Sequence, residues 1–179
     1  MPGVAFGASH TTWSPQRVPL PPGSKSAVCG CLMHLKVACT AVGDWSPDRS
    51  EEAVYPLVER WGGRVWALQP TPRLRPAGTE GSLYVVSCAT VQVCVAVGVL
   101  SSPDFSQFDL AMTWNGRRWR VERPGSDQDT LASVSCASPR TCLAVGGWEC
   151  PQRRGGRAMG WVTMARSAAA GEHEPCDGR

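Results

Sequence analysis

The sequence lacks long apolar runs, a strong net charge and all but three histidines, and each absence excludes a class of protein. No apolar stretch approaches the roughly 20 residues that a membrane-spanning helix needs, so we expect no membrane span. The formal net charge of +3 is too small to predict nucleic-acid binding. With 42% hydrophobic and 18% charged residues, most of the chain should be globular.

Residues that could carry catalysis are scarce, and the histidines are His10, His34 and His173. None of them forms, with a serine or a cysteine, a pattern that indicates a catalytic triad. Carboxylates cluster at 51–52 and at Asp127 and Asp129 in predicted loops. Solvated charge is the simpler interpretation of these clusters, and a glycosidase-type pair is the alternative. No glycine-rich phosphate loop follows a predicted strand either, so we expect no enzymatic activity, no cofactor and no metal site.

What the sequence does contain is a repeated cysteine pattern. Residues 86–98 and 134–146 both have the form V-S-C-x5-C-x-A-V-G, and a less regular copy ends at Gly43. A second motif follows, W-N-G-x-x-W at 114–119 and W-G-G-x-x-W at 61–66. The glycines that end the first motif are 55 and 48 residues apart. A period of this length is typical of one four-stranded unit of a larger repeat.

Each copy contains short strand-like segments. The first strand is predicted at 83–88 or 131–136, and the second at 94–100 or 142–148, which is apolar on both faces and therefore buried on both. Asn115-Gly116 predicts a two-residue type I′ turn between the third and fourth strands. We predict an all-β fold of about three four-stranded blades of the β-propeller type. Because propellers usually have four to eight blades, three would be part of a larger propeller or half of a dimeric one.

The expected organisation is a repeat domain over 12–163 between a disordered N-terminus at 1–11 and a disordered tail at 164–179. The parts of the repeat domain are the last strand of an incomplete blade at 12–25, blade 1 at 26–72, blade 2 at 83–124 and blade 3 at 131–163. The third copy lacks a fourth strand. The segment around Trp13 would supply that strand if it paired beside 158–163.

The cysteines are interpreted first as disulfides. Cys88–Cys94 and Cys136–Cys142 each bracket the turn between two adjacent strands, which brings them within bonding reach. Buried free thiols and a zinc site are the alternatives, although the five-residue spacing is unusual for zinc. In the first copy Met33 occupies the position of the partner of Cys39. Cys31, or else Cys29, is then the expected partner, whereas Cys150 and Cys176 have no place in the repeat.

The tryptophans and the motif glycines are expected to be structural. The paired tryptophans alternate with polar residues, which indicates a core position, with a sugar-stacking platform as the alternative. Glycine after Ala-Val is expected where a close neighbour leaves no room for a side chain. The predicted core positions are Trp61, Trp66, Trp114, Trp119, Trp161, Gly43, Gly98 and Gly146.

The motifs at 86–98, 114–119 and 134–146 resemble the repeats of exported actinobacterial proteins that look like β-propeller blades. The resemblance covers roughly 12–163. It implies export, an extracellular or cell-surface location, and a binding or scaffold role. The first seven residues have no basic segment followed by an apolar one, so no signal peptide is expected within this sequence.

The predicted function is therefore a non-enzymatic binding or interaction module. Its ligand, a protein or a carbohydrate, would be contacted by the blade loops. A hydrolase or lyase of propeller type and a non-functional fragment of a larger exported protein are the alternatives. Association into a homodimer, or pairing with further blades, would complete the ring that three blades cannot close.

Overall fold

The computed structural model describes residues 4–9, 12–17, 25–34, 38–47, 53–122, 129–149 and 157–165, with side chains described within 38–47, 53–122 and 131–146. Every regular element in these ranges is a β-strand, which confirms the predicted all-β class. Because the described residues form no helix, they also contain no helix that could cross a membrane.

The strands form four antiparallel sheets in chain order. The N-terminal hairpin consists of β1 (Val4–Ser9) and β2 (Thr12–Arg17). The first sheet consists of β3 (Lys25–His34), β4 (Ala38–Ser46), β5 (Tyr55–Trp61) and β6 (Trp66–Leu68). The second sheet consists of β7 (Glu80–Thr90), β8 (Val93–Ser101), β9 (Gln107–Trp114) and β10 (Trp119–Glu122). The third sheet consists of β11 (Asp129–Ser138), β12 (Thr141–Glu149) and β13 (Arg157–Ala165).

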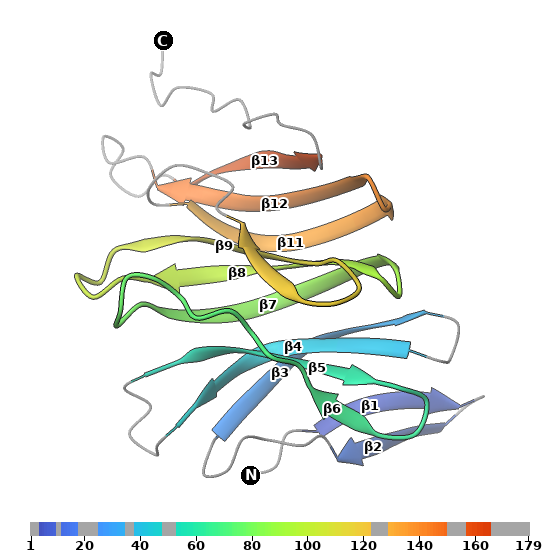
Figure 1. Ribbon diagram of the computed structural model, residues 1–179. Helices are drawn as coiled ribbons and strands as arrows, with labels where there is room; N and C mark the ends of the chain where they lie inside the picture. The colour runs from blue at the N-terminus through green and yellow to red at the C-terminus, as the bar shows by residue number, and fades with distance from the viewer. Residues whose placement is uncertain are drawn as a thin grey trace.

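The three larger sheets lie one above the other, and each strand pairs with its neighbour in sequence (Figure 1). The first strands of the sheets follow one another through the stack, because β7 contacts β3 on one side and β11 on the other. Each sheet stays open, since its first and last strands do not pair. The structure therefore shows a stack of two four-stranded sheets and one three-stranded sheet, and none of them closes into a ring.

The N-terminal segment differs from the prediction in two ways. Val4–Ser9 form β1, where the sequence predicted disorder, and β2 pairs with β1 instead of lying beside β13. Only two residues separate β1 from β2, so closing this hairpin costs far less chain entropy than pairing the two ends of the chain. Residues 166–179 of the predicted tail lie outside the described residues, as do 1–3 and 10–11.

The predicted two-residue turn at Asn115-Gly116 is wrong, because the loop has four residues. Trp114 pairs directly with Trp119, and the side-chain oxygen of Asn115 accepts hydrogen bonds from the backbone N–H groups of Arg117 and Arg118, at 3.1 and 3.0 Å. This local bonding replaces the tighter turn. The longer loop shifts the register by an even number of residues, so the faces assigned to the two strands are unchanged.

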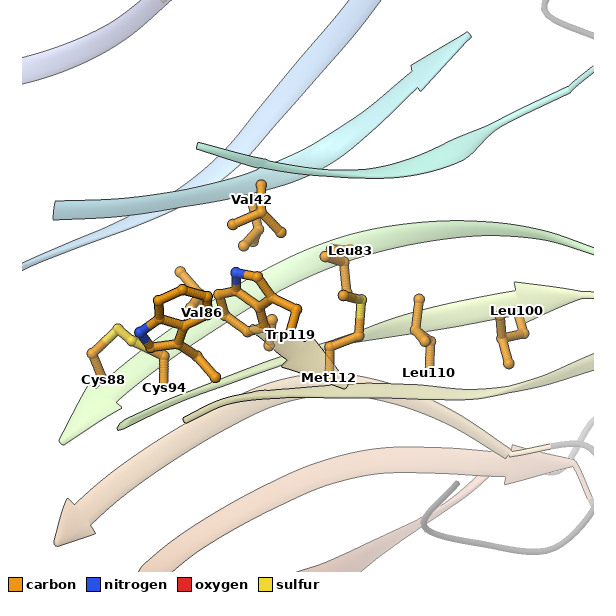
Figure 2. Close-up of a cluster of buried hydrophobic side chains, with 12 residues drawn as sticks. Val42, Leu83, Val86, Cys88, Cys94, Leu100, Leu110, Met112 and Trp119 are labelled. Atoms are coloured by element: carbon orange, nitrogen blue, oxygen red, sulfur yellow. A yellow bond between two sulfur atoms is a disulfide. The ribbon is translucent and has the colours of Figure 1, made fainter. Parts of the chain in front are cut away.

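Two apolar clusters hold the sheets together. The larger one lies between the first and second sheets, where Val42 points from β4 towards Leu83 and Trp119 (Figure 2). Its buried members are Val42, Val58, Leu83, Val86, Cys88, Cys94, Ala96, Leu100, Leu110, Met112, Trp114 and Trp119. The second lies between the second and third sheets, and its buried members are Val95, Val97, Ala111, Leu131, Val134, Cys142 and Ala144. β8 is thus buried on both faces, as its apolar run predicted.

Polar contacts join the same sheets. The hydroxyl of Ser87 on β7 accepts a hydrogen bond of 2.9 Å from the backbone N–H of Cys136 on β11. Arg60 on β5 donates to the backbone carbonyl of Val91, and its guanidinium carbon lies 5.5 Å from the ring centroid of Trp114. Arg60 therefore connects the first sheet both to the β7–β8 turn and to the core of the second sheet.

Replacing Arg60 with methionine is expected to lower the free energy of unfolding by about 1 kcal/mol, because the hydrogen bond and the cation–π contact are lost while the apolar stem is kept. The measurement is urea denaturation of the oxidised protein. Arg64→Met is the matched control, because Arg64 is exposed in the β5–β6 loop. Equal denaturation midpoints for the two variants would show that Arg60 does not couple the sheets.

Candidate functional site

The predicted cysteine pairs form cross-strand disulfides. Cys88–Cys94 joins β7 to β8 and Cys136–Cys142 joins β11 to β12, with Cα–Cα distances of 3.9 and 4.0 Å. Both pairs stand directly opposite in register next to a two-residue turn. Cys88, Cys94 and Cys142 are buried, so these bonds are placed to hold the hairpins rather than to react with a substrate. Two disulfides indicate an oxidising environment.

The first sheet carries a third disulfide at Cys39. The side chain of its partner lies outside the described residues. Cys31 pairs in register with Ala41, and Cys29 stands at the register shift between Val28 and Gly30, so the choice between the two stays open. Cys150 and Cys176 also lie outside the described residues.

The tryptophans of the second sheet are core residues. Trp114 and Trp119 are buried, and their ring centroids are 5.7 Å apart. Trp61 and Trp66 form a similar pair in the first sheet at 5.8 Å, but both are only half-buried. Trp161 pairs in register with Val145, and its side chain lies outside the described residues. The buried pair has no free ring face for stacking a sugar.

The motif glycines occupy one position in all three sheets. Gly43, Gly98 and Gly146 pair with Val28, Leu83 and Leu131, and each of those partners immediately precedes a register shift in its strand. A Cβ on Gly98 would lie 2.0 Å from the backbone oxygen of Ser82. Glycine is therefore required there by the close approach of the neighbouring strand.

The described residues offer no assembled catalytic or metal site. They contain no group of three histidine, cysteine or acidic side chains that could hold a metal ion. The predicted carboxylates at 51–52 and at Asp127 lie outside the described residues, and so does the side chain of Asp129, the first residue of β11. The side chain of His34 at the end of β3, together with His10 and His173, also lies outside them.

Two buried carboxylates were missed by the sequence analysis, Glu59 on β5 and Asp109 on β9. Glu59 is 1% exposed, and neither of its carboxylate oxygens has a hydrogen-bond partner among the described residues. Burial raises the pKa of Glu59 to about 7. Glu59 pairs in register with Ala41, and Met112 pairs in the same way with Ala96, the equivalent alanine of the second copy. Aligning the copies strand by strand would therefore have shown an acid at a position that is apolar in the other copy.

The candidate binding surface lies at one end of the first and second sheets, where the β6–β7 connection at 69–79 meets the β8–β9 loop at 102–106. A Cβ on Gly78 would lie 3.3 Å from Cγ of Pro103, so the two segments touch. We call these two segments the loop surface. The β6–β7 connection is anchored to the first sheet, because the hydroxyl of Thr71 donates to the carbonyl of Pro56 at 3.2 Å.

Phe105 is an exposed apolar residue of the loop surface. Its side chain is 91% exposed, and its φ of 66° is unusual for a residue other than glycine. The backbone N–H of Phe105 donates to the carbonyl of Ser102 at 2.8 Å, and the N–H of Ser106 donates to the carboxylate of Asp104 at 3.1 Å. The side-chain hydrogen bond from Ser102 lowers the pKa of Asp104, which keeps this acceptor ionised. The loop therefore presents an apolar ring from a hydrogen-bonded turn.

The β6–β7 connection of the loop surface also carries basic residues. Arg73 and Arg75 are exposed on the β6–β7 connection, beside the exposed Pro76. The prediction assigned the ligand contacts to blade loops but named none of these residues. The signal was an apolar residue among turn-forming neighbours in Ser102-Pro103-Asp104-Phe105-Ser106, where no strand could bury it.

Comparisons with known proteins do not assign the chain to a family. No protein-family model matches the chain, and no curated protein is significantly similar to it. The resemblance of the motifs to exported propeller-type repeats therefore stays a prediction. Any function has to be inferred from the loop surface and from the arrangement of the sheets.

Proposed function

We propose that the protein is a non-enzymatic binding module built from propeller-type blades, and that it contacts a partner protein through the loop surface. The observation that carries the proposal is the position of Phe105, a fully presented apolar ring held by hydrogen bonds within a turn. An aromatic ring that is held outward by a fixed turn is the kind of side chain that anchors protein–protein interfaces.

The propeller-type arrangement is supported by the strand order and the packing. In each of the three larger sheets the strands follow the chain from β3, β7 or β11 outwards, and these three first strands are in contact in series. First strands near a central axis and face-to-face sheets are typical of propeller blades. The β4–β5, β6–β7 and β8–β9 connections all leave from the same end of the sheets, which is where a blade-loop site would form.

A protein is the favoured partner because of the chemistry of the loop surface. Phenylalanine and arginine are enriched where proteins bind one another, and the hydrogen bonds around Ser102 fix the turn before binding occurs. A carbohydrate site would need an aromatic platform, but the tryptophan pair of the second sheet is buried. The half-buried pair Trp61 and Trp66 flanks the β5–β6 loop, at the other end of the sheets from the loop surface. The disulfides support an extracellular or cell-surface location for this binding.

The test is panning of a random peptide library displayed on phage against the oxidised protein. Peptides selected on the wild type are expected to lose at least about tenfold in affinity on Phe105→Ser, because the central anchor contributes about 1.4 kcal/mol or more. Val65→Ser is the matched control, since Val65 is 69% exposed in the β5–β6 loop at the other end of the sheets.

Peptides that bind the two variants equally well would refute the loop surface as the binding site. An array of defined glycans provides the second arm. Glycan binding that is lost in Phe105→Ser, without any peptide binding, would replace the protein partner with a carbohydrate. Circular dichroism of both variants excludes unfolding as the cause of a loss.

A further inference from the structure

The outer face of the third sheet, turned away from the second sheet, is not covered by any other strand or loop in the described part of the chain. Its described residues are Ser133, Ser135, Thr141, Leu143 and Val145. On the same strand Cys142 and Ala144 point towards the second sheet and are buried, whereas Leu143 between them is 40% exposed. The alternation along β12 therefore divides an occupied face from an open one.

The corresponding faces of the other two sheets are covered. Leu143 follows the second cysteine of its motif as Val95 and Thr40 follow theirs, and Val95 and Thr40 are each only 6% exposed. Val95 packs against the third sheet, and the hydroxyl of Thr40 lies 4.0 Å from the sulfur of Cys94 in the second sheet. The position after the second motif cysteine is thus covered by a neighbouring sheet in the first and second sheets, and it is exposed in the third sheet.

The serine that pairs in register with this residue is also buried in the second sheet and exposed in the third sheet. Ser87 pairs with Val95, is buried, and accepts its 2.9 Å hydrogen bond from Cys136 in the next sheet. Ser135 pairs with Leu143 in the same way, but it is exposed and its hydroxyl has no such bond among the described residues. Both an apolar and a polar group on the outer face therefore occupy positions that are covered by a neighbouring sheet elsewhere in the chain.

A second copy of the chain is the occupant that fits this face. The face of the first sheet that points away from the second sheet is not available in that copy, because Ala41, Leu57 and Glu59 are at most 3% exposed. Among the described residues, the sheet face that stays uncovered in the second copy is the outer face of its own third sheet. None of its five described residues carries a charge, so these residues of two copies can meet without like-charge repulsion.

We propose that the outer face of the third sheet is a dimer interface, and that it docks on the same face of a second copy about a two-fold axis. Such a contact is isologous, so it closes with two chains and does not propagate. Leu143 and Val145 form the apolar centre, and the hydroxyls of Ser133 and Ser135 form its polar part. The dimer is independent of the loop surface, which belongs to the first and second sheets.

The experiment measures molar mass by light scattering on the eluting full-length protein. The wild type is expected to elute with twice the chain mass of 19.2 kDa. Leu143→Lys and Leu143→Glu are each expected to elute as monomers, because two like charges would meet at the axis. An equimolar mixture of the two variants is expected to recover the dimer, because the charges are then opposite.

Val65→Lys is the control and should remain dimeric. A wild type that is monomeric even at its highest soluble concentration would overturn the proposal, as would variants that dimerise like the wild type. A dimer that both variants lose but the mixture does not recover would overturn the two-fold contact of this face with itself. Far-ultraviolet circular dichroism verifies that the variants are folded.

Discussion

Alanine at Gly98 is expected to lower the free energy of unfolding by roughly 3 kcal/mol or more, or to prevent folding. The added Cβ would lie 2.0 Å from the backbone oxygen of Ser82 and 2.9 Å from Cα of Leu83. Both atoms belong to the backbone of β7, so no side chain can rotate away to make room. The strand itself would have to shift, and Leu83 in the apolar core would shift with it.

Gly62→Ala is the matched control for this substitution. Gly62 lies in the β5–β6 loop, and a Cβ there would meet nothing within 4 Å. Its free energy of unfolding is expected to stay within about 0.5 kcal/mol of the wild type. Urea denaturation under non-reducing conditions measures both variants, and equal midpoints for Gly98→Ala and Gly62→Ala would refute the close approach of β7 to β8.

Methionine at Glu59 is expected to stabilise the protein by about 3 kcal/mol at and above pH 7. The pKa of a solvated glutamate in the unfolded chain is 4.5, and burial raises the pKa of Glu59 to about 7 in the folded protein. Below pH 4.5 the carboxyl is neutral in both states and stability does not change. Between pH 4.5 and 7 the unfolded chain releases its proton while the folded chain keeps it, so stability falls as the pH rises.

The methionine variant should lose this slope, because it has nothing to ionise at position 59. Methionine also fits the site, since Met112 occupies the same register position in the core of the second sheet. Glu122→Gln is the control, because Glu122 is an exposed carboxylate that accepts a 3.1 Å hydrogen bond from Thr113. Denaturation midpoints at about pH 4.5, 6 and 8 decide the matter. A Glu59→Met profile parallel to that of the wild type would contradict the prediction.

The parts of the fold that were predicted from the sequence depend on local patterns. The cysteine spacing located adjacent strands, and the disulfides Cys88–Cys94 and Cys136–Cys142 stand where two such strands turn. The glycine after Ala-Val was expected at a close approach, and Gly98 is at one. These features repeat in the chain, so each copy supported the interpretation of the others.

The features that escaped prediction depend on single side chains or on competition between segments. The loop after Trp114 has four residues because the Asn115 side chain bonds two backbone N–H groups, which dipeptide statistics do not capture. The pairing of β2 was decided by the nearness of β1 in the chain. Glu59 places an acid in the core, and Phe105 places an aromatic ring on the surface. Each departs from the hydrophobic pattern that the copies share, so a pattern averaged over the copies hides both residues.

The disulfide-pinned turns and the loop surface lie at opposite ends of the sheets. The turns at 91–92 and 139–140 fix the register of their hairpins, whereas the β6–β7 connection at 69–79 lies at the other end. The longer of the two spacings between motif glycines, 55 against 48 residues, contains this connection. The end that sets strand alignment is thus separate from the end where chain length varies. New recognition sequences could consequently be inserted at 69–79, while the disulfides at the other end preserve the alignment of the strands.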